Sequence, residues 1–334
     1  MFRFAKLQFE IQLLDAFPPT EFLGSRLRGG YGLGLLAQLC RQSDPLTCAN
    51  QWHRCECDYG RLFRPTRETS GRKIVGAPLR DAKNLPAPFV IDSPAFGAHA
   101  YRAGERVLFG FGAIGPMCDL SSAAIRAVEE FGKLGLILNP HRRAHFRLLT
   151  VRDLLDSGRE IYDAGKIRSP VTLNITEGAS LPGKFGNELL IRFLTPTRIE
   201  NENARQKDRE TGLAIFADFY DFVYNATQRV AGLWQMYGED WPGPAEFYRW
   251  RERLLKQARQ VETIDADLTM MRLCGYSNLQ EEDKPLDGFV GSMQFRGDFS
   301  PFIDVLRIAE LVHIGAETTA GLGQFRMIDN MSPQ

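Results

Sequence analysis

A glycine-rich segment at residues 315–323, close to the end of the chain, constrains the fold more than any other feature. The residues before it are apolar at three- and four-residue steps, which predicts a helix. These positions are Phe302, Val305, Leu306, Ala309 and Val312. Residues 324–328 alternate in the manner of a short strand. The order is therefore helix, glycine loop, strand. A dinucleotide fingerprint or a P-loop needs strand, glycine loop, helix, so neither nucleotide site is expected.

Three glycines of this segment, Gly315, Gly321 and Gly323, are typical of an anion-binding surface. Glycine lets a backbone approach a ligand closely and turns its N–H groups outward, and clustered N–H groups bind anions. The alternative is an ordinary surface loop, which the glycines by themselves do not exclude.

A similar order occurs in the first half of the chain. A helix is predicted over residues 120–131, followed by Gly132, a basic loop at 139–143 and a strand that begins near Phe146. Gly132 corresponds to Gly315, and Phe146 to Phe325. An internal repeat of this size indicates two similar domains.

The predicted elements give both halves the same architecture. The first half has strands at 2–14, 88–91, 106–111 and 146–149, with helices after residue 20 and over 120–131. The second half has strands at 188–193, 266–273, 289–295 and 324–328, with helices over 211–237, 245–260 and 301–313. This order is that of the split βαβ unit. We therefore predict an α+β protein with tandem ferredoxin-like (RRM-like βαββαβ) domains at residues 1–152 and 165–330, joined by a linker over 153–170.

Composition and charge are those of a soluble globular protein, with 44% hydrophobic and 25% charged residues. No apolar run approaches the length of a membrane span, and residues 1–6 do not form a signal peptide. We expect a cytoplasmic protein without a membrane partner. Because the formal net charge is +0, local basic patches would have to hold any nucleic acid.

Short glycine-based motifs near both ends of the chain resemble the RAMP superfamily of CRISPR-associated RNA-binding proteins. The motifs are Gly288, Gly291 and Gly297, Phe299-Ser-Pro-Phe302, Leu311-Val-His-Ile-Gly315, Gly321-Leu-Gly-Gln-Phe325, Leu27-Arg-Gly-Gly30 and Tyr59-Gly-Arg-Leu-Phe63. Within the superfamily the chain is most similar to the endoribonuclease that processes CRISPR repeat transcripts in antiviral defence. The resemblance implies that the partner is CRISPR repeat RNA. It also implies metal-independent cleavage beside a repeat hairpin, which leaves a 2′,3′-cyclic phosphate.

The resemblance places RNA on the glycine loop, and arginines near the two repeated loops would contact its phosphates, because a guanidinium binds phosphate bidentately. The predicted RNA-binding residues are Arg28, Arg142, Arg143, Gly315, Gly321, Gly323 and Arg326.

Metal-free cleavage needs a base for the 2′-hydroxyl and an acid for the leaving 5′-oxygen, and His suits both roles near neutral pH. His313 adjoins the glycine loop and is the first candidate; the alternative is a His that interacts with the dipole of its helix. His141 lies in the equivalent loop of the first domain, where it could instead bind phosphate. Tyr31 is a third candidate. No cofactor is expected for catalysis.

Four cysteines and a histidine cluster at Cys40, Cys48, His53, Cys55 and Cys57. The resembling family often carries a Cys-rich insertion here, which we place at about residues 40–63 of the first domain. In a cytoplasmic chain such clusters favour a structural zinc over disulfides. The spacing departs from a pair of C-x-x-C knuckles, so free structural thiols are the alternative.

Two other functions compete with RNA cleavage. The chain could be a non-catalytic RAMP subunit that binds guide RNA, with CRISPR effector complex subunits as further partners. It could also be a zinc module unrelated to RNA, but that hypothesis leaves the repeated loops unexplained.

Overall fold

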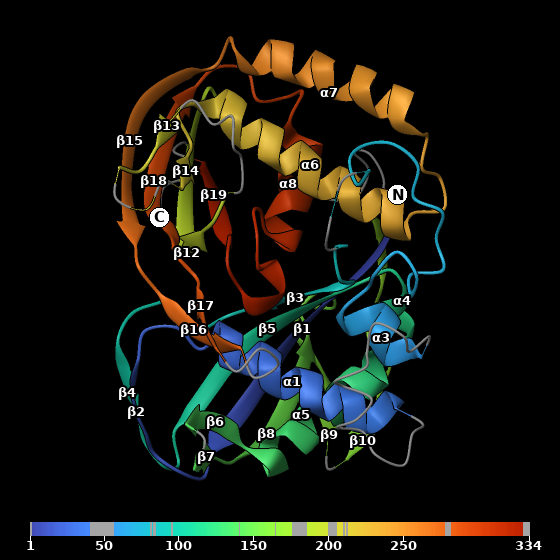
Figure 1. Ribbon diagram of the computed structural model, residues 1–334, viewed down its shortest axis with the longest axis vertical. Coiled ribbons are helices and arrows are strands. Elements are labelled where there is room, and N and C mark those ends of the chain that lie inside the picture. The colour runs from blue at the N-terminus through green and yellow to red at the C-terminus, as the bar shows by residue number, and fades with distance from the viewer. Residues whose placement is uncertain are drawn as a thin grey trace.

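The computed structural model describes residues 2–40, 57–80, 82, 85–94, 96–139, 141–163, 165–175, 186–199, 206–209, 211, 213–277 and 282–329. These residues form two α+β domains, the first in the lower half of Figure 1 and the second in the upper half. Within these ranges, no helix is both long and apolar enough to cross a membrane.

The first domain is built on an antiparallel sheet around β1 (Phe2–Leu13). The strand order is β10-β9-β8-β1-β5-β3, and β11 pairs with the start of β1. The bounds are Phe89–Asp92 (β3), Arg106–Ile114 (β5), Phe146–Asp153 (β8), Arg159–Asp163 (β9), Lys166–Ile167 (β10) and Leu173–Ile175 (β11). Two small hairpins flank the sheet: β2 (Phe17–Thr20) with β4 (His99–Tyr101), and β6 (Leu136–Asn139) with β7 (Arg142–Ala144).

Two helices, α1 (Gly24–Leu39) and α5 (Ser121–Leu134), cover one face of this sheet. The glycines of α1 let α5 approach closely. A Cβ on Gly30 would lie 1.8 Å from the Phe131 ring, and one on Gly34 would lie 2.0 Å from the Ala127 carbonyl oxygen. Close packing therefore offsets the poor helix propensity of glycine. The shorter helices of the domain are α3 (Asp58–Phe63) and α4 (Pro116–Asp119).

The second domain has the strand order β15-β18-β12-β19. The bounds are Glu188–Thr197 (β12), Glu262–Met271 (β15), Gly288–Arg296 (β18) and Phe325–Asp329 (β19). Helices α6 (Phe219–Tyr237) and α8 (Ile303–Val312) contribute to the core beside the sheet, and α7 (Pro244–Ala258) packs on α6. Two-stranded ribbons are formed by β13 (Gln206–Lys207) with β14 (Ala214–Ile215) and by β16 (Cys274–Ser277) with β17 (Glu282–Pro285).

The orders β8-β1-β5-β3 and β15-β18-β12-β19 are both that of a ferredoxin-like βαββαβ domain. The predicted fold class is confirmed. Two details of the prediction are wrong. Strands β9 and β10 occupy much of the expected linker at 153–170 and extend the first sheet. Helix α6 begins at Phe219, not near residue 211, because the Asp218 side chain accepts from the Asp221 N–H and caps it there.

Strand β1 serves both domains. Leu7 and Phe9 pack against the helices of the first domain, whereas Phe2 and Phe4 belong to the core of the second. The apolar alternation of β1 therefore changes face at Ala5-Lys6. One hydrophobic core spans the domain junction as a result.

Candidate nucleic-acid interface

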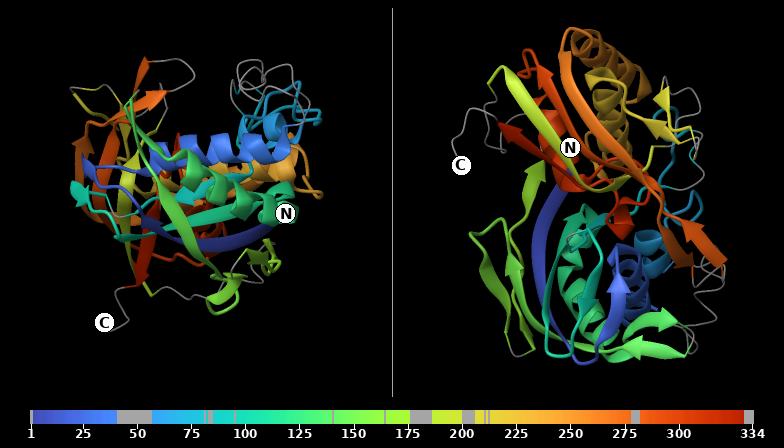
Figure 2. Two further views of the ribbon diagram at one scale, coloured as in Figure 1. Left: turned by 90° about the horizontal axis from the view of Figure 1, so that it is seen from below. Right: turned by 90° about the vertical axis from the view of Figure 1, so that its left-hand side faces the viewer.

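The glycine loop, residues 313–324 between α8 and β19, lies where the two domains meet (Figures 1 and 2). Its middle forms the short 3-10 helix η2 (Thr318–Ala320), which contacts β3 and α1. A Cβ on Gly24 of α1 would lie 1.9 Å from the Ala320 carbonyl oxygen, and a Cβ on Gly321 would lie 3.0 Å from that of Ile91. The loop is therefore packed against the first domain and does not protrude into solvent.

Many of the amide donors of this loop are used inside the protein. The N–H groups that donate to backbone carbonyls include those of Ala316, Ala320, Gly321, Leu322 and Gly323. Sequence reasoning expected the glycines to turn such groups outward, and for Gly321 and Gly323 that expectation is wrong. The binding of RNA by the loop glycines stays a prediction, but it cannot rest on these amides.

The glycines instead permit close contact between backbones. A Cβ on Gly315 would lie 2.3 Å from the Arg198 carbonyl oxygen, and a Cβ on Gly323 would lie 1.8 Å from that of Ile314. Both glycines also have a positive φ, which side chains disfavour. A side chain at either position would overlap a neighbouring backbone, so this loop conformation requires glycine at both.

Arg28 on α1 brings positive charge to the loop. Its Nε donates to Thr319 Oγ1 at 2.8 Å, and its guanidinium lies 4.7 Å from the centre of the Phe63 ring. Burial lowers the pKa of Arg28 to about 10, helped by the neighbouring Arg64, so the group stays charged at neutral pH. Burial also lowers the pKa of Arg64, and Glu317 opposes the shift of both arginines. Two arginines and one carboxylate leave this corner positive, which favours a phosphate.

The ribbon β16–β17 closes another side of this corner. A Cβ on Gly275 would lie 2.6 Å from the Leu286 side chain and 3.5 Å from Ser25 Oγ of α1. Phe22, Leu286 and Leu322 join in a small apolar cluster beneath it. The corner is thus built from α1, the glycine loop and a ribbon of the second domain.

His313 ends α8 but does not reach solvent. Its side chain is 1% exposed, and its Nε2 lies 3.0 Å from Asp92 Oδ1 of β3. Burial lowers the pKa of His313, and this outweighs the opposing effect of Asp92. RNA cannot reach the imidazole in this arrangement, so its predicted catalytic role has no geometric support.

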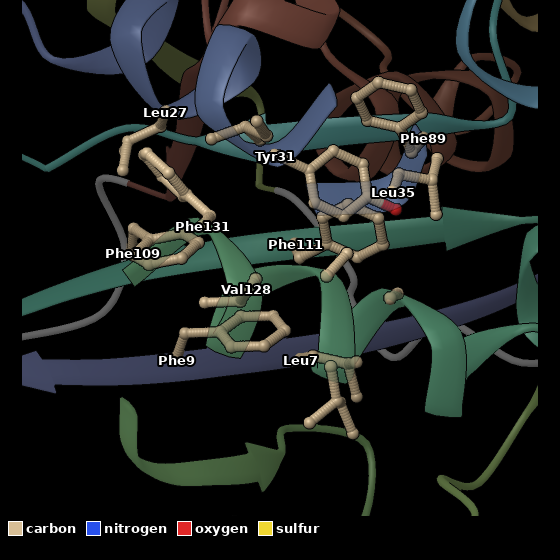
Figure 3. Packing of buried hydrophobic residues seen from close by; sticks show 14 of the residues in the cluster. Leu7, Phe9, Leu27, Tyr31, Leu35, Phe89, Phe109, Phe111, Val128 and Phe131 are labelled. Atoms are coloured by element: carbon tan, nitrogen blue, oxygen red, sulfur yellow. The ribbon is translucent and has the colours of Figure 1, made fainter. Parts of the chain in front are cut away.

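Tyr31 lies in the core of the first domain and is 2% exposed. Figure 3 shows its ring among Leu35, Phe89 and Phe111, and its hydroxyl lies 3.6 Å from Met117 Sδ. Burial raises the pKa of the phenol well above its usual range. The position suits packing and gives no path for proton exchange with RNA.

The remaining predicted residues lie away from this corner. Exposed His141 lies in the turn of the β6–β7 hairpin. Arg142 and Arg143 of that hairpin donate to the Ala16 and Leu134 carbonyls at 2.9 and 3.1 Å. Arg326 lies on β19, 3.7 Å from Glu310. Of the predicted arginines, the structure brings Arg28 to the glycine loop.

Most of the Cys-rich insertion lies outside the described residues, including Cys48, His53 and Cys55. Cys40 and Cys57 lie within the insertion, on either side of its undescribed residues, and both pack against the first core. In the described part of the chain, no three His, Cys, Asp or Glu residues are grouped to hold a metal. Structural zinc stays a prediction.

Sequence reasoning missed Arg64, Lys6 and Asp92. Arg64 directly follows the Tyr59–Phe63 motif, so the motif could have indicated it. Lys6 is marked by the change of face in β1, because a charged residue stands where apolar positions switch from even to odd. Asp92 carries no signal in the sequence.

Comparison with known families decides the affiliation. The model of an N-terminal domain family, AF_1859_N, matches residues 2–176, about half of the chain, and the model of the CRISPR-associated endoribonuclease Cas6 matches residues 191–325. Residues 2–176 belong to the family that the AF_1859_N model describes, and residues 191–325 are similar to the Cas6 endoribonucleases. An uncharacterized protein of Archaeoglobus fulgidus is 27% identical over 179 residues, which cover 54% of this chain and 55% of that protein. The chain thus spans about half the length of this curated relative.

Solved Cas6 structures share the fold. A Cas6 product complex, from a protein of Thermus thermophilus, has a TM-score of 0.54 at 16% identity and covers 98% of this chain and 100% of that chain. A partial Cas6-RT-Cas1–Cas2 complex has a TM-score of 0.58 at 13% identity and covers 100% of this chain and 47% of that chain. At these identities the likeness establishes the tandem ferredoxin-like fold.

Proposed function

We propose that this chain is an endoribonuclease that binds CRISPR repeat RNA at the corner formed by α1, the glycine loop and the β16–β17 ribbon. The observation that carries the proposal is the partly buried Arg28 residue, whose guanidinium is held by Thr319 of the loop and lies near Arg64. A phosphate between these arginines would offset their mutual repulsion. The Cas6 family model and the Cas6 product complexes support RNA as the ligand.

The proposed reaction is metal-independent. A base removes the proton of the 2′-hydroxyl, the 2′-oxygen attacks the adjacent phosphorus, and the 5′-oxygen leaves with a proton from an acid, which yields a 2′,3′-cyclic phosphate. Positive charge near the phosphate, here from Arg28 and Arg64, would stabilise the phosphorane. His313 and Tyr31 are buried, and His141 is the exposed candidate for proton transfer among the predicted residues. Because His141 lies in the β6–β7 hairpin away from the corner, it could act on RNA bound at that hairpin but not on a phosphate held by Arg28 and Arg64.

A direct test compares two arginines of the same helix. Arg28→Gln removes the charge at the loop. Arg26→Gln removes a guanidinium that instead donates to the Ile137 carbonyl at 2.6 Å. Loss of a charged hydrogen bond should weaken binding of a repeat hairpin by about tenfold or more for Arg28→Gln. Arg26→Gln should stay within about threefold of wild type, because the Arg26 guanidinium is bound to a carbonyl of β6 and not to the glycine loop. Equal effects of the two variants would remove the loop corner as the RNA site.

The second candidate function, a non-cleaving RAMP subunit that binds guide RNA, is favoured by the burial of His313 and Tyr31. Single-turnover incubation with repeat RNA in EDTA separates the two. A product ending in a cyclic phosphate supports the endoribonuclease. If His141→Ala then slows cleavage by about 10²- to 10⁴-fold, His141 is the acid or base. Tight binding with no cleavage supports the non-cleaving subunit.

A further inference from the structure

A buried ion network joins the two domains where the glycine loop begins. Lys6 Nζ of the first domain lies 2.6 Å from the Asp92 carboxylate, and His313 Nε2 of the second lies 3.0 Å from the same carboxylate. The side chains are 11%, 15% and 1% exposed, respectively. Three polar groups from β1, β3 and the end of α8 thus meet out of water.

The protonation state follows from the geometry. Burial raises the pKa of Asp92, but Lys6 and the hydrogen bond from His313 more than reverse this, so the carboxylate is ionised. A carboxylate only accepts, so the His313 Nε2–H donates to it. Nδ1 is then the unprotonated nitrogen, and it is buried without a hydrogen-bond partner among the described residues.

Burial keeps the imidazole neutral by lowering its pKa; Lys6 and Arg229 add to this shift, and Asp92 opposes it. Asp92 faces it from β3, Lys6 from β1 and Arg229 from α6. The Arg229 guanidinium donates to the carbonyl of Val312, the residue before His313, at 3.1 Å. Protonation of Nδ1 would place a third cation beside Lys6 and Arg229, and the Asp92 carboxylate is already paired with Lys6. In a buried site such an additional charge is costly.

The backbone at His313 also points to a role for its side chain. Its φ is +59° and its ψ is 170°, a combination that is essentially restricted to glycine. A histidine at this position accepts some strain, and the bond to Asp92 offsets it. The side chain therefore determines where the loop leaves α8.

We propose that Lys6, Asp92 and His313 form an interdomain latch, and that His313 is a positioning residue for the glycine loop, not an acid or base. The latch sets the loop in place against β3 and α1, so that Thr319 meets Arg28. This inference rests on the proposed function for its RNA readouts, but not for its structural readout.

The structural test is hydrogen exchange of the peptide that covers residues 313–323. Asp92→Asn should speed its exchange by about tenfold or more, because a hydrogen bond to a charged group is lost. The matched control is Asp119→Asn. It breaks an exposed ion pair with Arg3, which lies on β1 as Lys6 does, and it should leave hydrogen exchange of the loop peptide unchanged. If Asp92→Asn fails to fold, His313→Leu replaces it, since it leaves the Lys6–Asp92 pair intact. A folded variant of either kind with unchanged exchange of this peptide overturns the latch.

The second test separates positioning from proton transfer. His313→Gln keeps an N–H donor for Asp92 but cannot titrate. The latch predicts RNA affinity and single-turnover cleavage within about threefold of wild type at pH 8. It also predicts the same change of affinity with pH for the two proteins between pH 7.5 and pH 6.5, because the lowered pKa keeps folded His313 neutral there. If His313→Gln instead loses about 10²- to 10⁴-fold in cleavage with its affinity intact, His313 transfers protons and the positioning role is overturned. If wild type neither binds nor cleaves repeat RNA, the proposed function fails, and the exchange experiment still decides the latch.

Discussion

Replacement of Gly323 by alanine should test whether the glycines of the loop exist for packing. Gly323 has a φ of +71°, and a Cβ there would lie 1.8 Å from the Ile314 carbonyl oxygen. The left-handed conformation costs alanine about 1–2 kcal/mol. Relief of the overlap requires a backbone shift, for which overpacking data suggest about 1–3 kcal/mol more. The total is about 2–5 kcal/mol of the free energy of unfolding.

The matched control is Gly158→Ala in the first domain. Gly158 has a φ of +74°, and nothing lies within 4 Å of its Cβ position. Only the conformational cost of about 1–2 kcal/mol should apply there. The difference between the two variants therefore isolates the close contact of the loop with its neighbours.

The free energy of unfolding of both variants can be measured by urea unfolding. Tryptophan fluorescence follows the second domain, which contains Trp234, Trp241 and Trp250. Gly158→Ala needs a circular-dichroism readout as well, because it lies in the first domain. Equal losses of stability in the two variants would refute the packing argument, because the close contact at Gly323 would then contribute nothing.

Three further predictions follow from individual groups. The free energy of unfolding should fall as the pH drops below about 6.5, because His313 binds a proton there in the unfolded chain but, with its lowered pKa, not in the folded chain. The lowered pKa of Asp92 in the folded chain adds to this loss at still lower pH. A flat stability profile from pH 7 to pH 5 would contradict the buried neutral imidazole. Protein purified without chelators should contain about one zinc per chain if the Cys-rich insertion is a structural site, and less than a tenth of an equivalent in folded protein, by elemental analysis, would favour free thiols. Tyr31→Phe should retain RNA cleavage and lose at most about 1 kcal/mol of stability, since only a weak contact with Met117 Sδ is removed; a large loss of cleavage with normal stability would make the hydroxyl catalytic.

Local patterns in the sequence were enough to predict the fold class. The period of the apolar residues around α8 and the alternation in β19 identified the elements, and the repeated order identified two domains. These signals are local, because each helix or strand must bury one face wherever it lies. Strands β9 and β10 were missed, since short edge strands have few positions on which a period can show.

The site depended on contacts that no local pattern carries. Arg28 and Thr319 are 291 positions apart, and His313 and Asp92 are 221 positions apart. The residue types at the loop were visible in the sequence, and their resemblance to the RAMP motifs implied RNA and a nearby acid or base. Whether His313 faces solvent or a buried carboxylate was decided by how the second domain packs on β1 and β3. The same packing explains why the loop glycines serve as points of close contact and not as amide donors for a ligand. Which residues are buried, and which partner each N–H group finds, depends on neighbours that come together only in the folded chain.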